Sequence, residues 1–292
     1  MLDRNALKKH LPGVAGAVVL VLALLETAQA VLAPSRAPTD ADWNAAAAAV
    51  RAQFAEGDLI VAAPAWADPV MRMHLGSLVP IAMATRLDDA RYARVWEISQ
   101  KGATTPEAQG TERYRARFGN LTVRRVEREP AKLKYDFVEQ WRQARVSRQS
   151  PAGVVACAAL PDRIQCPDIA FNWVKPAVLE FDFGLHRALY TQPVAGAAVV
   201  VEFDDVPLGR TLTVGVGLHH VWLRKAGSGH VTLNVLIGGR SIAHLTVDNR
   251  SPWQPVDLPT AAFAGQRQVV RFEITSDNAF SRHLGFAAEA RE

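Results

Sequence analysis

Polar and aromatic side chains follow two predicted strands, Leu59–Ala63 and Arg94–Ser99, where they could form a ligand site. The carboxyl ends of neighbouring parallel strands meet at one edge of a sheet, and such sheets bind ligands there. A carboxylate, two cations, a hydroxyl and an aromatic ring at that edge would suit a sugar or a phosphate group. Capping of a helix by Asp68, just before Pro69, explains part of the same pattern. The candidate residues are Trp66, Asp68, Arg72, Ser99 and Lys101.

A second set of candidates lies in the carboxyl-terminal third of the chain. Tyr190, Trp222 and Trp253 could be stacking platforms for sugar rings, although tryptophan in a sandwich more often belongs to the core. His219 and His220 are adjacent, so in a strand they point to opposite faces, which argues against a metal site. Neither a serine–histidine–acid arrangement nor a closely spaced carboxylate pair stands out. We therefore expect no catalytic residue, no metal and no cofactor.

The two cysteines, Cys157 and Cys166, bracket eight residues and lack the spacing of a redox motif. In an oxidising compartment they would form a disulfide, which closes a short loop and contributes about 3 kcal/mol by the chain-entropy relation. We interpret the pair as a structural clip at the junction of two domains.

The amino terminus indicates export. Three basic residues precede Leu11–Leu25, which is fifteen residues without a charge. Leu11–Ala33, at 23 residues, is long enough for a signal anchor that crosses a bilayer. A cleaved signal peptide is the alternative, because Ala28-Gln29-Ala30 supplies a small-x-small cleavage site. Either interpretation places residues 34–292 outside the cytoplasm, in a single-pass membrane protein or, after cleavage, in the periplasm or medium.

The region after the leader predicts an α/β domain at residues 40–150, joined to residues 1–33 by a proline-containing spacer at 34–39. An alanine-rich helix starts near Asp40 or Asp42, and apolar strands alternate with helices, including one predicted at Glu107–Phe118. This order predicts a small, mainly parallel sheet with helices packed on it. A glycine-rich phosphate loop is absent, which argues against a dinucleotide site.

Residues 151–174 form the cysteine-containing junction, and residues 175–292 predict an all-β domain. Short, regularly spaced runs of alternating apolar and polar residues favour a jelly-roll-like β-sandwich. The clearest element is a hairpin from Val231 to Val247, whose strands meet at Gly238-Gly239. Both glycines tolerate the positive φ angles of a tight primed turn.

The formal net charge is +4, and the excess of basic residues lies at residues 113–148. Eleven basic residues face four acidic ones there. An exported chain without a stacking motif for bases is not expected to bind nucleic acid. Anionic lipid headgroups or a lipid-linked phosphate fit this segment better, and a solvated arginine-rich face is the alternative.

Several segments together resemble the extracytoplasmic region of bacterial polytopic glycosyltransferases of the dolichyl-phosphate-mannose mannosyltransferase type, which use lipid-phosphate sugars. The resemblance covers most of residues 40–290 and is carried by diffuse patterns. It runs through Asp42–Ala47, Gly57–Val61, Ala63–Pro69, Arg94–Ser99, Tyr135–Glu139, Asp205–Gly209 and the Gly238-Gly239 hairpin.

The chain departs from this family in one important respect. Those enzymes carry their catalytic acid in a loop beside many membrane helices, whereas this chain has one apolar segment and no such loop. No catalytic residue can therefore be transferred to it. The resemblance implies an accessory module that acts with a polytopic transferase, or the soluble part of a split enzyme.

These observations lead to one main hypothesis and three alternatives. The main hypothesis is an exported, membrane-anchored, non-catalytic protein that recognises envelope glycan or assists glycosylation. The alternatives are the soluble part of a split, lipid-phosphate-sugar-dependent glycosyltransferase, a small envelope hydrolase that uses the strand-end residues, and a purely structural envelope protein. The expected partners are the membrane, through residues 11–33, a glycan or lipid-linked sugar, and a polytopic glycosyltransferase.

Overall fold

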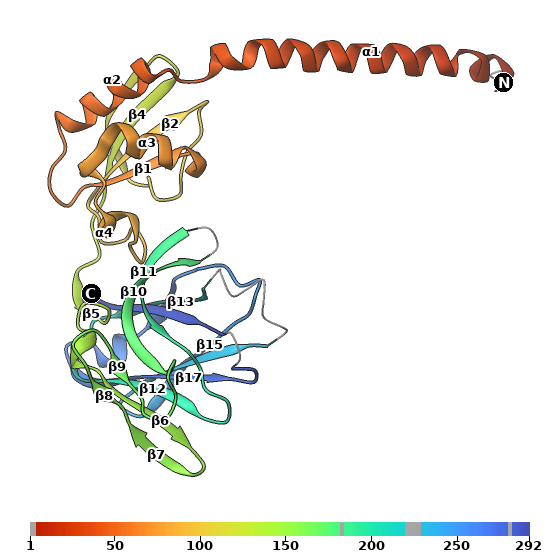
Figure 1. Ribbon diagram of the computed structural model, residues 1–292. Coiled ribbons are helices and arrows are strands. Elements are labelled where there is room, and N and C mark those ends of the chain that lie inside the picture. Colours follow the sequence, from red (N-terminus) through yellow and green to blue (C-terminus); the bar gives the residue numbers. More distant parts are fainter. Residues whose placement is uncertain (1–3, 182–183, 220–228, 280–281) are drawn as a thin grey trace. The chain divides into compact units, whose positions relative to one another are not determined.

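The computed structural model describes residues 4–181, 184–219, 229–279 and 282–292 (Figure 1). The chain forms two compact units. The first comprises the chain up to Gly76 together with Arg94–Glu127, and the second comprises Ser77–Ala93 and Arg128–Glu292. This division differs from the predicted boundary at residue 150, because residues 128–150 already supply strands to the sheets of the second unit.

The first unit begins with the long helix α1 (Arg4–Arg36). Across the described residues, no helix combines the length and the apolar character needed to cross a membrane. The next helix, α2 (Asp40–Arg51), is capped by Thr39, whose hydroxyl accepts a hydrogen bond from the Asp42 backbone at 3.2 Å. The Asp42 carboxylate accepts one from the Thr39 backbone in return, so the cap precedes both predicted aspartates by at least one residue.

The sheet of the first unit contains four strands in the order β1-β2-β4-β3. Only β1 and β2 are parallel, so the prediction of a mainly parallel sheet is wrong. A helix was predicted at Glu107–Phe118, but Thr111–Phe118 instead form β3, which turns through Gly119 into β4. Gly119 has a φ of 54°, which suits the first position of a two-residue hairpin turn. The strands are β1 (Leu59–Ala63), β2 (Arg94–Gln100), β3 (Thr111–Phe118) and β4 (Leu121–Glu127).

A helical stretch follows β1 and consists of the 3-10 turn η1 (Ala65–Ala67) and the helix α3 (Asp68–Leu75). Pro69 lies in the first turn of α3, where its missing N–H costs no hydrogen bond. Asp68 lies inside the helix, and the N-cap residue is Ala67, which makes no side-chain cap bond. The chain then passes through η2 (Gly76–Leu78) into α4 (Ile81–Ala84), which belongs to the second unit.

The second unit is a β-sandwich, which confirms the predicted all-β character of the carboxyl-terminal region. One sheet has the order β16-β13-β18-β11-β10-β9-β8, with β5 also paired to β18, and the other has the order β15-β14-β17-β12-β6-β7. The short turns η3 (Trp141–Gln143) and η4 (Ala261–Phe263) connect strands. The first sheet contains β5 (Leu133–Asp136), β8 (Ala158–Ala159), β9 (Ile164–Gln165), β10 (Trp173–Phe181), β11 (Gly184–Thr191), β13 (Thr211–Leu218), β16 (Val256–Pro259) and β18 (Leu284–Arg291). The second contains β6 (Arg145–Ser150), β7 (Gly153–Ala156), β12 (Ala198–Pro207), β14 (Val231–Ile237), β15 (Arg240–Val247) and β17 (Arg267–Ser276).

The core between the two sheets is built from alternating residues of their strands. Phe272 of β17 and Phe286 of β18 are fully buried, with ring centroids 4.9 Å apart. In β14 the predicted inner residues, from Val231 to Ile237 at every second position, are all buried. The hairpin turn is also confirmed, because Gly238 and Gly239 have φ angles of 56° and 81°.

The predicted disulfide between Cys157 and Cys166 is present. Cys157 lies between β7 and β8, and Cys166 follows β9. Both cysteines belong to the second unit rather than to a linker that precedes it. The clip therefore braces the edge of the sandwich.

Candidate functional site

The strand-end residues of the first unit do not share one pocket. Trp66 and Lys101 line a hollow of about 260 Å³. Asp68 and Arg72 form an ion pair of 2.7 Å with each other along α3. Ser99 is buried, and its hydroxyl donates to the Thr122 carbonyl at 3.3 Å. The structure thus brings two of the five residues together and gives the other three structural contacts.

The arginine-rich segment contains many ion pairs. Arg124 donates to the buried Glu97 carboxylate at 2.6 and 3.0 Å, and the hydrogen bond raises the pKa of Arg124. Arg125 lies 3.4 Å from Glu127. Paired charges contribute less to attraction of an anionic partner than free ones. These contacts favour the solvated, self-paired arginine face over an anion-binding one.

Two aromatic candidates of the sandwich are packed against their neighbours. Tyr190 is buried, its hydroxyl is hydrogen-bonded to Nδ1 of His283, and burial raises the pKa of Tyr190 to about 12. The Trp253 ring stacks on Phe181, with centroids 4.7 Å apart, and on His186, at 4.6 Å. Neither ring is therefore a free platform. The third candidate, Trp222, lies outside the described residues.

Glycines on β13 and β18, in the larger sheet of the sandwich, make room for this aromatic packing. A Cβ atom added at Gly285 would lie 2.4 Å from Phe181, and one added at Gly215 would lie 2.5 Å from Trp253. Both distances are shorter than van der Waals contact. The aromatic cluster around Phe181 therefore needs glycine, which has no side chain, at positions 215 and 285.

A different aromatic side chain, Phe171, is exposed at the start of β10. It is 63% exposed, and its ring centroid lies 6.2 Å from that of Trp173. Trp173 in turn lies 6.2 Å from Tyr190, so the three rings form a row that ends in the buried cluster. Two cations flank the middle ring: the guanidinium of Arg163 and the ammonium of Lys175 lie 5.5 and 5.8 Å from its centroid. We call Phe171, Trp173, Arg163 and Lys175 the loop surface.

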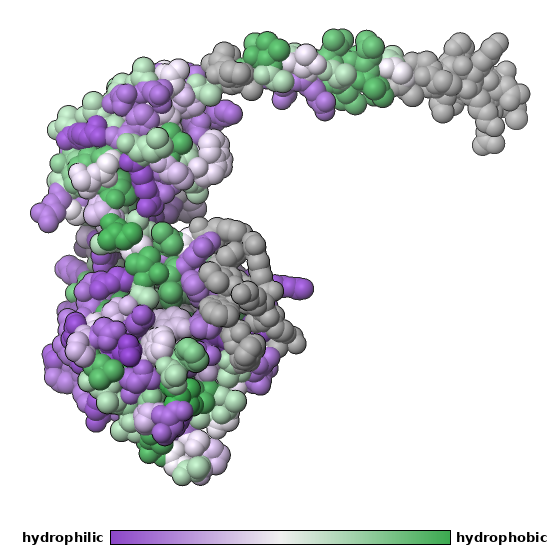
Figure 2. All heavy atoms as spheres, in the orientation of Figure 1, coloured by the Kyte–Doolittle hydropathy of each residue, from purple (hydrophilic) through white to green (hydrophobic). Residues whose placement is uncertain are grey.

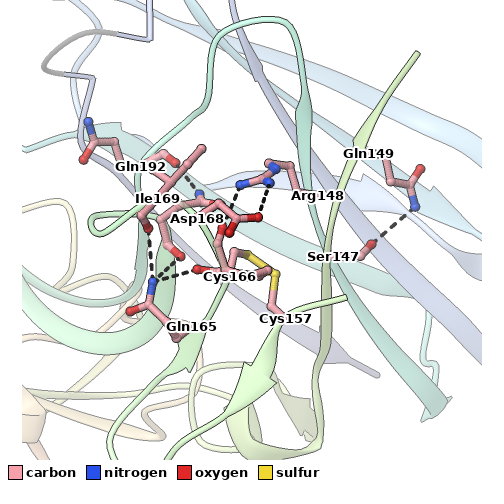
Figure 3. Close-up of a disulfide and its surroundings, with 11 residues drawn as sticks. Ser147, Arg148, Gln149, Cys157, Gln165, Cys166, Asp168, Ile169 and Gln192 are labelled. Carbon is pink, nitrogen blue, oxygen red and sulfur yellow. Dashed lines mark hydrogen bonds and ion pairs between the residues drawn. A yellow bond between two sulfur atoms is a disulfide. The ribbon is translucent and has the colours of Figure 1, made fainter. Parts of the chain in front are cut away.

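The loop that carries Phe171 is held in place by hydrogen bonds that its backbone carbonyl groups accept (Figure 3). The Gln165 side-chain amide donates to the carbonyls of Cys166, Ile169 and Asn172, at 2.9, 3.2 and 3.1 Å. The Asn172 side chain donates to the Gln192 carbonyl at 3.0 Å. The disulfide ties the beginning of the loop to Cys157. These bonds satisfy partly buried carbonyl groups and hold the loop against its neighbours.

Arg148 adds a further brace from a neighbouring strand, β6. It donates to the Pro167 carbonyl at 3.1 Å and lies 3.9 Å from the Asp168 carboxylate (Figure 3). Asp168 has a φ of 65°, a conformation that aspartate adopts more readily than most residues. The loop therefore turns sharply just before it presents Phe171.

A pair of carboxylates lies on another part of the second unit. Asp136 and Glu289 are opposite each other in the β5–β18 ladder, and burial raises the pKa of each. Arg291 donates to Glu289 at 2.7 Å and to Asp88 at 2.8 Å. The cavity beside them has a volume of about 50 Å³, enough for a few water molecules but too small for a sugar ring. We therefore assign the cluster to stability rather than to catalysis.

The described ranges contain no group of three or more His, Cys, Asp or Glu side chains that could hold a metal ion. The sequence did not identify Phe171 or Arg163 as candidates. A usable signal was present, because the large aromatic Phe171 comes only three residues after Asp168, in a loop where polar residues are expected. The partnership of Asp136 with Glu289 had no comparable signal, because the two residues are far apart in the chain.

No family model and no curated protein matches the chain. Among solved structures, it is similar to the CBM51 module of a Clostridium perfringens GH95 protein in complex with methyl-galactose, with a TM-score of 0.30, 14% identity and coverage of 40% of this chain and 81% of that one. A CBM36 carbohydrate-binding module in complex with calcium and xylotriose gives a TM-score of 0.24 at 13% identity, over 40% of this chain and 87% of that one. The CBM51-2 and INT domains of Clostridium perfringens ZmpB, in complex with GlcNAc, give 0.32 at 11% identity, over 66% and 40%. Likenesses at these TM-scores are too weak to support an argument about function.

Proposed function

We propose that this chain is an exported, membrane-anchored and non-catalytic protein that recognises glycan through the loop surface of its sandwich. The observation that carries the proposal is the exposed ring of Phe171 on a loop fixed by a disulfide and by Gln165. An exposed aromatic ring can stack on the apolar face of a sugar. A loop that is already ordered loses little entropy on binding, so more of the contact energy appears as affinity.

The cations of the loop surface restrict the class of ligand that we expect there. Arg163 and Lys175 lie beside the aromatic row. A sugar stacked there would bring its substituents close to a guanidinium and an ammonium group. Arg163 already lies 3.3 Å from Asp162 and donates to Gln165 at 3.1 Å, so we expect Lys175 to be the main cationic contact for a carboxylate or phosphate group. The proposal therefore favours glycans that carry carboxylate or phosphate groups, lipid-linked sugar phosphates included.

Export and anchoring are part of the same proposal. A disulfide persists in an oxidising compartment, and the pairing of Cys157 with Cys166 is consistent with one. The described side chains of α1 cover residues 16–32 only, and they include exposed valine and leucine residues from Val18 to Leu25 and at Val31 and Leu32. Exposed apolar side chains in such numbers favour an apolar environment. We propose α1 as the anchor and a polytopic glycosyltransferase in the same membrane as a partner.

The full chain in detergent, applied to a glycan array and followed by calorimetry on the best saccharide, tests the recognition step. We expect Phe171→Ala to weaken binding about tenfold, which corresponds to about 1.4 kcal/mol. Val154→Ala is the matched control, because Val154 is equally exposed but lies on β7, away from the aromatic row. Binding of no saccharide, or equal loss in both variants, would refute glycan recognition at this surface.

A further inference from the structure

The helical stretch after β1 exposes a group of apolar side chains in the first unit. Trp66 is 67% exposed, Val70 is 38% exposed and Met73 is 81% exposed. Their spacing of four and three residues places them along one side of η1 and α3. We call these three residues the α3 surface.

This exposure is not due to a poorly packed helix. Met71 and Leu75, on another side of α3, are almost completely buried, and so is Ala67 of η1. The helix therefore already buries one apolar side against its own unit. The α3 surface is a second apolar side, for which the described residues of the first unit provide no cover.

The chain that leaves α1 is fixed beside this surface. Ala37 and Pro38, which directly follow the helix, line the same hollow as Trp66 and Val70. The Asn120 side chain donates to the Ala37 carbonyl at 3.3 Å and ties this segment to the turn between β3 and β4. Whatever surrounds the end of α1 is therefore also close to Trp66.

The described part of α1 exposes two apolar stretches, which are separated by the polar residues Glu26, Thr27 and Gln29 (Figure 2). Val31 and Leu32, near its end, are 72% and 47% exposed. Lys101 lies at the same hollow as Trp66. Tryptophan is enriched at the boundary between lipid tails and headgroups, and lysine can extend its ammonium group toward water from there.

We infer that the α3 surface is a membrane-contact site, which rests in the headgroup region of the bilayer that holds α1. This inference depends on the membrane anchoring proposed above. The occupant is a lipid surface, because Trp66 and Val70 share their hollow with Ala37 and Pro38, which directly follow α1, and α1 carries exposed valine and leucine side chains. The role of the surface is to hold the first unit against the membrane instead of leaving it tethered by a free spacer.

The test uses the full chain in vesicles of phosphatidylethanolamine and phosphatidylglycerol, doped with a lipid that carries a nitroxide close to its headgroup. The nitroxide quenches tryptophan emission on contact. We expect Trp66→Phe to reduce the quenched part of the emission by roughly half or more. Trp253→Phe, which removes a tryptophan packed in the sandwich, should leave the quenched part unchanged.

A second variant, Val70→Asp with Met73→Asp, keeps every tryptophan and changes only exposed positions. It should remain attached to the vesicles through α1 in a flotation assay but lose most of the quenching. Attachment with unchanged quenching in both variants would overturn the inference alone and leave the α3 surface to a protein partner. Failure of the unmodified chain to float with the vesicles would overturn both the anchoring and this inference.

Discussion

The α3 surface and the loop surface expose their aromatic residues to the same degree but surround them differently. Trp66 is 67% exposed and has Val70 and Met73 as neighbours, whereas Phe171 is 63% exposed and lies beside Trp173 with its two flanking cations. Exposure alone therefore does not distinguish them. Apolar neighbours suit a non-directional contact, such as one with lipid tails. Nearby charges suit a ligand that carries polar groups at fixed positions.

The two surfaces also differ in what keeps them rigid. The α3 surface lies on a helix, whose backbone groups are satisfied by its own hydrogen bonds. The loop surface lacks a regular ladder between Cys166 and Asn172, so its carbonyls depend on Gln165 and its position depends on the disulfide. Changes to these braces should damage one surface and leave the other intact.

Removal of the disulfide should have the largest effect. We expect Cys157→Ser with Cys166→Ser to lower the free energy of unfolding by about 3 kcal/mol, because the unfolded chain is no longer constrained by the closed loop. Urea unfolding of the full chain in detergent measures this change. Saccharide binding should fall with it, whereas quenching of Trp66 by lipid nitroxide should not change.

Val154→Ala again provides the control, since Val154 is exposed and lies on β7, three residues before Cys157. A disulfide-free protein that still binds saccharide with full affinity would show that the loop does not need its clip. In that case the contrast in rigidity between the two surfaces would no longer hold.

A methyl group added beneath the aromatic cluster should have the next largest effect. In Gly285→Ala the new Cβ would lie 2.4 Å from the Phe181 ring and 2.9 Å from Leu179, so the cluster must shift. Overpacking of this kind costs about 1–3 kcal/mol, measured as a loss in the free energy of unfolding. The same shift should reach Trp173, which packs against this cluster, and weaken saccharide binding.

Gly285→Ala combined with Phe181→Leu provides the discriminating measurement. The smaller side chain removes the clash, so the double variant should recover part of the stability that the single change loses. If the double variant instead loses as much stability as the two single variants together, the added methyl group does not act through the Phe181 ring.

Local signals in the sequence were sufficient for a large part of the fold. Leu59–Ala63 and the Gly238-Gly239 hairpin were predicted with the bounds or turn residues that the structure has, and Arg94–Ser99 ends one residue before β2 does. The first and the second have short-range causes, which are an unbroken apolar run and a pair of glycines. The disulfide was likewise predicted from only two cysteines.

The failures have a common physical origin in contacts that are distant in sequence. Thr111–Phe118 is rich in Arg and Glu, which favour helices, yet pairing with β4 makes it a strand. Residues 128–150 were assigned to the wrong side of a boundary because β5 and β6 find their partners, β18 and β12, more than 50 residues later. For the site, the sequence suggested Tyr190 and Trp253 as stacking platforms for sugar rings, but it did not show that both rings are packed against other residues.

The smallest predicted effect is a pH dependence confined to the sandwich. His283, hydrogen-bonded to Tyr190 at the inner end of the aromatic row, has its pKa lowered to about 4 by burial and by the charge of His219. The unfolded chain, with an ordinary histidine pKa of about 6.5, binds the proton more readily between these values. The free energy of unfolding should therefore fall as the pH drops from about 6.5 to about 4. After a discount for the partial exposure of the ring, the loss is about 1 kcal/mol.

The buried carboxyls Asp136 and Glu289 act in the opposite direction, since burial raises the pKa of each and protonation then favours the folded state. The informative quantity is thus the difference between the unmodified chain and His283→Gln, compared by urea unfolding at a pH of about 7 and of about 4.5. We expect the variant to lose less stability on acidification. Equal losses would mean that His283 binds a proton as readily in the folded state as in the unfolded chain.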